Sequence, residues 1–249
     1  MMLELTSLSK HFGGVKAVDG LDLNIEAGKI FGLIGPNGSG KSTTINLICR
    51  LIDATAGNIV IDGQDISSAA PHEVVAAGIG RTFQNIRLFQ SLTVWQNLWV
   101  AQKEAPEGRQ EGFFRRWLSG PGNARENISS HLDFANLSGK RDVLAGNLSF
   151  GEQRRLELAR AMATTPKMLL LDEPAAGMNQ EEIKQLEERL RTLREGGVTI
   201  LLVEHVMELV MGVTDRIAVL NFGQKIAEGS PSEIQNNQAV QDAYLGKSD

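Results

Sequence analysis

A nine-residue segment, GPNGSGKST, constrains the fold of this chain more than any other feature. It occupies residues 35–43, follows the apolar run KIFGLIG and precedes the helical pattern STTINLICRLI. Loop glycines cost backbone entropy, which a close ligand or an unusual turn would justify. The spacing from Gly35 to Gly40, Lys41 and Ser42, between a strand and a helix, matches a phosphate-binding loop.

Such a loop binds phosphate oxygens through its backbone N–H groups at a helix N-terminus. We expect Lys41 to reach the β- and γ-phosphates of a nucleotide, and Ser42 to ligate Mg²⁺. The nucleotide contacts predicted in the loop are Gly35, Pro36, Asn37, Gly38, Ser39, Gly40, Lys41, Ser42 and Thr43. A glycine turn with a purely structural role is the alternative, which the surrounding strand and helix patterns disfavour.

The segment LLLDEP, residues 169–174, supplies a second part of a nucleotide site. Asp172 ends a hydrophobic strand pattern, and a parallel sheet places the C-terminal ends of its strands beside the phosphates. We expect Asp172 to hold Mg²⁺, directly or through water, and Glu173 to face the attacking water. Two carboxylates that merely cap the following helix are the alternative.

Composition excludes several classes of protein. The 249 residues are 42% hydrophobic and 22% charged, as in a soluble globular protein. The net charge of −5 argues against a nucleic-acid-binding protein, and the single cysteine, Cys49, excludes an internal disulfide. The N-terminal residues lack the pattern of a signal peptide, and no apolar run is long enough to span a bilayer. A role at a membrane would therefore need a partner.

Strands alternate with helices along the chain, which predicts an α/β fold with a mostly parallel sheet. Strands are expected at 3–8, 21–26, 29–35, 56–63, 167–174, 198–203, 216–221 and 224–228, the last pair joined by a tight turn at NFGQ. Helices are expected at 42–52, 125–136, 151–164, 180–195 and 206–212. Residues from about 85 to 160 show no strong strand pattern and predict a helical subdomain. Within it, 104–124 indicates an insertion or linker with a short helix at about 113–118.

The segment LSFGEQRR, residues 148–155, indicates the family. Ser149 alone would favour a helix N-cap. With the phosphate-binding loop and LLLDEP, the set resembles the ATP-binding subunits of ABC transporters, whose signature reads leucine-serine-glycine-glycine-glutamine. Phe150 replaces the first of those glycines, and Glu152 replaces the glutamine, so its carboxylate is expected to point away from the nucleotide.

The resemblance covers nearly the whole chain and implies a P-loop NTPase fold of class α/β. It predicts one ABC nucleotide-binding domain over residues 1–249, with an antiparallel β subdomain and a helical subdomain. The implied cofactors are ATP and Mg²⁺. In this family the signature serves the ATP held by the opposite protomer, so Ser149 and Gly151 are expected to contact nucleotide bound to a homologous subunit in a head-to-tail dimer.

The resemblance also implies roles for residues outside these motifs. Phe12 matches the aromatic residue that stacks on adenine, with Val18 completing the platform, although an apolar Phe is more often a core residue. Gln84 matches the loop glutamine that senses Mg²⁺ and water, and His205 matches the switch histidine that touches the γ-phosphate. Asn179 stands where the family often has aspartate in its dimer-contact loop.

Within the family, residues 83–102, the insertion at 104–124 and the tail 228–246 resemble the ATP-binding subunits of branched-chain amino acid importers. This implies a sister ATP-binding subunit, two membrane permeases and an extracytoplasmic solute-binding protein, no nucleic acid, and a peripheral position on the cytoplasmic face of the membrane. Subunits for urea, amides or lipopolysaccharide export are similar and remain alternatives, because the ATPase does not touch the solute.

Three kinds of protein without a transport role are less compatible with the sequence. ABC ATPases of DNA repair or chromosome handling carry long coiled-coil insertions, and 104–124 is too short and lacks heptads. A soluble translation-type factor would normally carry two such domains. A scaffold without turnover is disfavoured because the catalytic positions Lys41, Asp172, Glu173 and His205 are all occupied by functional side chains.

An uncharged segment at 88–102 predicts a docking surface for a permease. It contains Trp95 and Trp99 at helical i, i+4 spacing but is too short and too polar to span a bilayer. In the resembled family a cytoplasmic helix of the permease docks here, so we expect Phe89 and Leu92 to contact that helix. A buried helix of the helical subdomain is the alternative.

Overall fold

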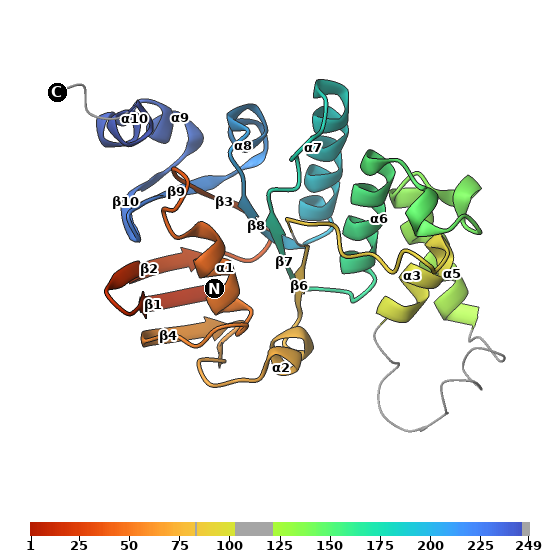
Figure 1. Cartoon of the computed structure of the whole chain (residues 1–249), viewed down its shortest axis with the longest axis horizontal. Helices are drawn as coiled ribbons and strands as arrows, with labels where there is room; N and C mark the ends of the chain where they lie inside the picture. The colour runs from red at the N-terminus through yellow and green to blue at the C-terminus, as the bar shows by residue number, and fades with distance from the viewer. Residues whose placement is uncertain (83, 103–121, 246–249) are drawn as a thin grey trace. The chain divides into compact units, whose positions relative to one another are not determined.

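The computed structural model describes residues 1–82, 84–102 and 122–245 (Figure 1). The chain divides into two compact units, one of residues 1–84 and 167–249 and the other of residues 85–166. None of the described helices combines the length and the apolar character needed to cross a bilayer. The expected short helix at 113–118, and most of the expected insertion at 104–124, lie outside the described residues.

The first unit contains a six-stranded sheet in the order β10-β9-β3-β8-β7-β6. Every residue of β3 (Ile30–Ile34), β7 (Met168–Asp172) and β8 (Thr199–Val203) is buried, which is typical of parallel strands covered on both faces. These strands, β6 (Ile79–Arg81) and β9 (Arg216–Asn221) all pair in parallel. The α/β class and the mostly parallel sheet are confirmed.

The one antiparallel pair of this sheet is a hairpin formed by β9 and β10 (Gln224–Gly229). Its turn residues, Phe222 and Gly223, have φ values of 46° and 79°. Two left-handed residues form the turn that matches the twist of a hairpin. The turn predicted at NFGQ is therefore confirmed.

A second, four-stranded sheet in the same unit is wholly antiparallel, in the order β2-β1-β4-β5. Its strands are β1 (Leu3–Phe12), β2 (Val15–Ile25), β4 (Ala56–Ile61) and the short β5 (Gln64–Asp65). Leu8 of β1, Ile45 of α1 (Lys41–Ile48) and Leu170 of β7 belong to one buried cluster. The helix that follows the phosphate-binding loop thus shares a core with both sheets.

The remaining helices of this unit are α2 (Pro71–Ala76), α7 (Gln180–Glu195), α8 (Met207–Val213), α9 (Pro231–Gln235) and α10 (Gln238–Leu245) (Figure 1). Helix α7 has a strongly one-sided pattern, and it buries Ile183, Leu186, Leu190 and Leu193 along one face. Helices α2, α9 and α10 were not predicted from the sequence. Proline in the first turn marks the start of α2 and of α9, and a capping box of Ser230 and Glu233 also marks the start of α9.

The second unit is helical in its described residues, apart from an isolated bridge between Thr93 and Leu144. It contains α3 (Val94–Ala101), α5 (Gly122–Phe134), α6 (Phe150–Met162) and the short 3₁₀ turns η1 (Ser138–Lys140) and η2 (Ala145–Asn147). Leu98, Leu132 and Leu156, one from each α-helix, are buried in its core. The range expected for a helical subdomain, about 85 to 160, lies close to that of this unit.

The helix predicted at 42–52 is shorter than expected. It ends at Ile48, and Arg50 adopts a left-handed φ of 55°, which an α-helix cannot contain. Leu51 is consequently 50% exposed and does not lie on the buried face with Ile45 and Ile48. The helical spacing of apolar residues in the sequence continues past Ile48, although the backbone leaves the helical conformation there.

Candidate nucleotide site

The loop at 35–43 has a backbone that only glycine permits at two positions. Gly35 and Gly40 have φ values of 149° and 106°. A Cβ atom at Gly35 would lie 2.1 Å from the Leu220 carbonyl oxygen, and one at Gly40 would lie 2.3 Å from the Ala17 carbonyl oxygen. Helix α1 begins directly after Gly40 without a side-chain cap, which leaves its first-turn N–H groups to phosphate oxygens.

Lys41 lies inside this loop. The side chain is buried, and its Nζ donates to the carbonyl oxygens of Gly35 and Pro36 at 2.7 and 2.9 Å. Burial lowers the pKa of Lys41, while the charges of Glu173 and Asp172 act in the opposite direction. The amine is thus held where phosphate oxygens would compete with two carbonyl groups for it.

Asp172 ends β7 and has two different carboxylate oxygens. Oδ2 lies 3.3 Å from Nη2 of Arg81, whose Nη1 donates to Oδ1 of Asn46 at 2.8 Å. Oδ1 is buried and has no hydrogen-bond partner among the described residues. Burial raises the pKa of Asp172, and the Arg81 charge opposes that shift. A buried oxygen without a partner fits a cation or ordered water that completes the site.

Within the described residues, no cluster of three or more His, Cys, Asp or Glu side chains could hold a metal ion by itself. Mg²⁺ is usually held by one or two carboxylates together with phosphates and waters. Asp172 and Ser42 would supply the protein oxygens. The residues present therefore fit a nucleotide-bound magnesium ion.

Glu173 is brought together with two other predicted residues. Nε2 of Gln84 donates to its Oε2 at 2.8 Å, and Nδ1 of His205 lies 3.9 Å from the same oxygen. The backbone of Glu173 has a left-handed φ of 50°, and its N–H donates to the Val203 carbonyl oxygen at 2.9 Å. A non-glycine residue in this conformation is strained, which is a frequent feature of functional positions.

Phe12 lies at the end of β1 and is 51% exposed, so its side chain is accessible to a ligand. Nζ of Lys10 lies 5.0 Å from the ring centroid. Val18 is different, because its side chain is fully buried. Its Cγ2 faces Gly40, 3.5 Å from where a Cβ would stand. Val18 therefore packs against the phosphate-binding loop, and its part in a platform for adenine stays a prediction.

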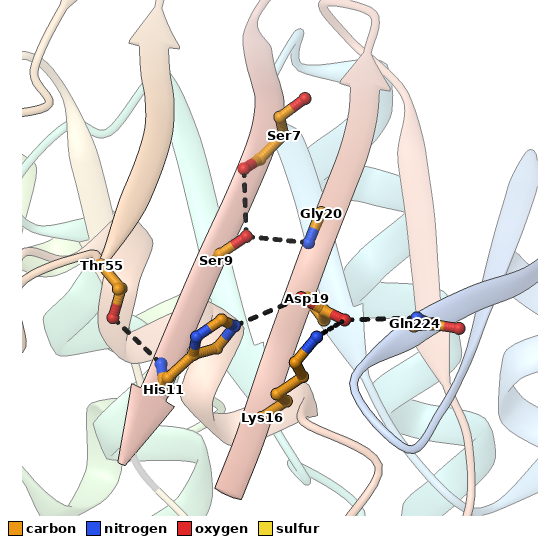
Figure 2. A network of polar contacts seen from close by, with 8 residues as sticks. All are labelled: Ser7, Ser9, His11, Lys16, Asp19, Gly20, Thr55 and Gln224. Carbon is orange, nitrogen blue, oxygen red and sulfur yellow. Dashed lines mark hydrogen bonds and ion pairs between the residues drawn. The ribbon is translucent and has the colours of Figure 1, made fainter. Parts of the chain in front are cut away.

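A polar network holds the hairpin that carries Phe12 (Figure 2). Its centre is Asp19, whose carboxylate lies within hydrogen-bond distance of His11 at 3.2 Å, Lys16 at 3.0 Å and Gln224 at 3.3 Å. The hydrogen bond from Lys16 is the largest cause of the lowered pKa of Asp19. In addition, the Asp19 N–H donates to the Gly223 carbonyl oxygen, and the Gly223 N–H donates to that of Ser39. The hairpin is thereby linked to the phosphate-binding loop.

Ser149 and Gly151 belong to the helical unit. Ser149 is the N-cap of α6, and Glu152 closes a capping box with it. The Glu152 carboxylate also pairs with Lys140 at 2.6 Å, so it is engaged within its own helix terminus. The helix-cap function of Ser149 is thus present, and its contact with a nucleotide stays a prediction. Asn179 caps α7 in the same manner, accepting from the Glu182 N–H at 3.0 Å.

The uncharged segment 88–102 divides between core and surface. Trp99 is buried and stacks on Trp95 with ring centroids 6.2 Å apart, as expected for the alternative of a buried helix. Phe89, by contrast, is 54% exposed, and the Arg160 guanidinium lies 5.6 Å from its ring centroid. An accessible aromatic residue remains available to a partner at this position.

Sequence reasoning missed two residues of the site, Arg81 and Glu204. Arg81 contacts Asp172, as described above. Glu204 is fully buried between β8 and α8 and accepts three backbone hydrogen bonds. Both are polar residues next to recognised motifs, in RTFQ and VEHV, and this proximity was the only signal in the sequence.

Comparisons with known proteins agree with this geometry. The ABC transporter family model matches residues 18–176. The chain is an ATP-binding protein of the ABC transporter family. It is therefore an ATPase, as the motifs indicated. A second model, for branched-chain amino acid ATP-binding cassette transporters, matches residues 224–249.

Individual relatives support the same family. The chain is 41% identical over 250 residues to the high-affinity branched-chain amino acid transport ATP-binding protein BraF of Pseudomonas aeruginosa, covering 99% of this chain and 98% of the relative. A nucleotide-free ATP-binding cassette from an ABC transporter, solved by crystallography, has 33% identity and a TM-score of 0.86, with 99% of each chain covered. The predicted resemblance to ATP-binding subunits of branched-chain amino acid transporters is confirmed.

The alternative from lipopolysaccharide export is more distant. The lipopolysaccharide export system ATP-binding protein LptB of Haemophilus influenzae is 35% identical over 246 residues, with 99% of this chain and 98% of the relative covered. The branched-chain amino acid interpretation is therefore favoured.

A dimeric cassette bound to ADP and phosphate has 27% identity and a TM-score of 0.77 over 92% of this chain and 99% of that chain.

Proposed function

We propose that this chain hydrolyses Mg²⁺-bound ATP to power the import of branched-chain amino acids. The observation that carries the proposal is the arrangement of Gln84, Glu173 and His205 around one carboxylate oxygen. Together with the loop lysine and Asp172, these are the groups needed to bind phosphates and position a water molecule.

In the proposed reaction the loop N–H groups and Lys41 bind the β- and γ-phosphates. Glu173 orients a water molecule and accepts its proton as the water oxygen bonds to the γ-phosphorus. The bond from the γ-phosphorus to the bridging oxygen breaks, and ADP and inorganic phosphate are the products. His205 donates a hydrogen bond to the γ-phosphate, and Gln84 helps to hold the water. Ser42, Asp172 and Gln84 would hold Mg²⁺, which would supply neutralisation of the phosphate charge when bound.

The active site is proposed to be composite. Ser149 and Gly151 at the start of α6 would contact ATP bound by the loop of a homologous subunit, in a head-to-tail dimer. A sister subunit is proposed rather than a second copy, following the resemblance to branched-chain amino acid importers. The dimeric cassette among the solved structures supports the existence of such pairs in this family.

The location is proposed to be the cytoplasmic face of the membrane, through two permease subunits, with an extracytoplasmic solute-binding protein acting on the other side. Phe89 and Leu92 would contact a cytoplasmic helix of a permease. The support is the exposed aromatic ring of Phe89 beside an uncharged helix, since aromatic anchors dominate many interfaces.

Two substitutions test the proposed chemistry. Lys41→Ala should abolish tight ATP binding, whereas Glu173→Gln should keep ATP binding and slow hydrolysis by about 10²- to 10⁴-fold, because positioning of the water belongs to the transition state. Nucleotide titration and phosphate release measure the two effects. Lys184→Ala and Glu181→Gln, two exposed changes on α7, are charge-matched controls. Wild-type turnover in Glu173→Gln would refute the role of Glu173.

A further inference from the structure

Glu204 is a buried carboxylate to which the reaction described above gives no role. It follows β8 directly, and its side chain is fully buried. Burying a carboxylate is costly unless hydrogen bonds compensate for the lost water. Specific contacts must therefore offset the free-energy cost of burying this carboxylate next to His205.

The two oxygens of Glu204 bind two different segments. Oε1 accepts from the Ala175 N–H at 2.7 Å, and Ala175 lies two residues after Glu173. Oε2 accepts from the N–H groups of His205 at 2.7 Å and Val206 at 3.0 Å. The side chain thus joins the segment after Glu173 to the segment that carries His205.

These three hydrogen bonds are charge-assisted, because the acceptor is an ionised carboxylate and the donors are backbone N–H groups. They fix the peptide groups on either side of the pair formed by Glu173 and His205. In that pair, Oε2 of Glu173 and Nδ1 of His205 lie 3.9 Å apart. A loss of the Glu204 carboxylate would free both segments and leave buried N–H groups without an acceptor.

We propose that Glu204 is a positioning residue that sets the separation of Glu173 and His205, and with it the rate of the hydrolytic step. It acts through the backbone N–H groups of Ala175, His205 and Val206, and its Oε2 also lies 3.7 Å from Nδ1 of the His205 side chain. The inference rests on the proposed ATPase function. Since the phosphate-binding loop is a separate element, Glu204 contributes to turnover and not to nucleotide affinity.

Glu204→Gln tests this inference with little change in shape. The amide oxygen can accept from one segment only, and the NH₂ group then faces the N–H groups of the other. The expected result is a 10- to 100-fold lower kcat, with KM for ATP and the Kd of a fluorescent ADP analogue changed less than about threefold, since one or two charge-assisted hydrogen bonds are lost. Glu208→Gln, an exposed change on α8, is the matched control and should leave kcat unchanged.

A double variant distinguishes positioning from general destabilisation. If Glu204 acts by positioning Glu173 and His205 together, Glu204→Gln should slow the His205→Ala variant by a smaller factor than it slows the wild-type protein. Any of three results would overturn the proposal. They are a loss of kcat in the double variant equal to the product of the two single losses, a wild-type kcat in Glu204→Gln, or a parallel loss of kcat and nucleotide affinity. If Glu204→Gln does not fold, Glu204→Asp, which keeps the charge but is too short to bridge both segments, is held to the same outcomes.

Failure of the ATPase function itself has a different signature. In that case the wild-type protein, assayed with its partner subunit, would release no phosphate above the level of Lys41→Ala. The Glu204 variants are interpreted only against a wild-type rate that depends on Lys41 and Glu173.

Discussion

Replacement of Arg81 by methionine tests how the buried acidic group of the site is stabilised. The change removes the guanidinium that lies 3.3 Å from Oδ2 of Asp172 and also contacts Asn46, while it keeps most of the aliphatic stem. The two side chains of the pair are only 11% and 6% exposed. Removal of one partner from a buried pair leaves an uncompensated charge and costs about 3–5 kcal/mol of folding free energy.

The loss of folding free energy in Arg81→Met should depend on pH, because protonation of Asp172 removes the uncompensated buried charge. Burial already raises the pKa of Asp172 above its ordinary value, and loss of Arg81 raises the pKa further. A carboxyl group with a raised pKa in the folded state favours folding most below its unfolded pKa of about 3.9. That contribution is lost as the pH rises through the folded pKa. The deficit of Arg81→Met relative to wild type should therefore grow from about pH 4 toward neutrality.

Urea unfolding of the magnesium-free protein at a series of pH values measures this deficit. When Arg81→Met is introduced into Asp172→Asn and compared with Asp172→Asn alone, the deficit should lose this pH dependence, since no carboxylate remains at residue 172. Arg216→Met removes one partner of an exposed pair with Glu228 and should cost no more than about 1 kcal/mol. A deficit for Arg81→Met as small as this control, or one that shrinks as the pH rises, would refute the reasoning.

Three further predictions concern other parts of the molecule. Ser149→Arg should leave ATP binding by the phosphate-binding loop intact but impair turnover in the dimer, and full activity in a demonstrable monomer would contradict a shared site. Phe89→Asp should weaken pull-down of the permease and uncouple hydrolysis from transport while ATP binding persists. Leu144→Asp, at an exposed apolar residue of the helical unit outside segment 88–102, is the control, and both variants must retain near-native thermal stability. Burial raises the pKa of Cys49 to about 11, so the thiol should resist alkylation at pH 8 until the protein unfolds, and rapid labelling of the folded protein would show that the core around α1 opens.

The parts of the site that could be predicted from the sequence are those in which neighbouring residues in the chain determine where the side chains lie. Gly35, Gly40 and Lys41 lie on one loop whose backbone is set by its own residues, and Asp172 and Glu173 follow an unmistakable buried strand. The sheet itself follows from runs of apolar residues that are long enough for a strand and too short for a helix. Such features need no knowledge of distant contacts.

The parts that escaped prediction depend on contacts between segments far apart in the sequence. No pattern indicates that Arg81 meets Asp172, 91 residues later, or that Glu204 accepts from Ala175. The packing of the buried Val18 side chain against the Gly40 position likewise follows only from the three-dimensional structure. Leu51 followed the apolar spacing of a helix that had already ended.

Because Glu173 has a left-handed backbone conformation, a substitution that stabilises the protein at this position would also lower its activity. Glycine or asparagine adopts this conformation more readily than glutamate, so either would relieve strain of about 1 kcal/mol while removing the carboxylate that we propose orients water. A library selected for heat resistance alone should therefore enrich inactive proteins at residue 173. Engineering a more durable form of this ATPase would require a hydrolysis screen at every round, because the most accessible gain at this site removes the reaction.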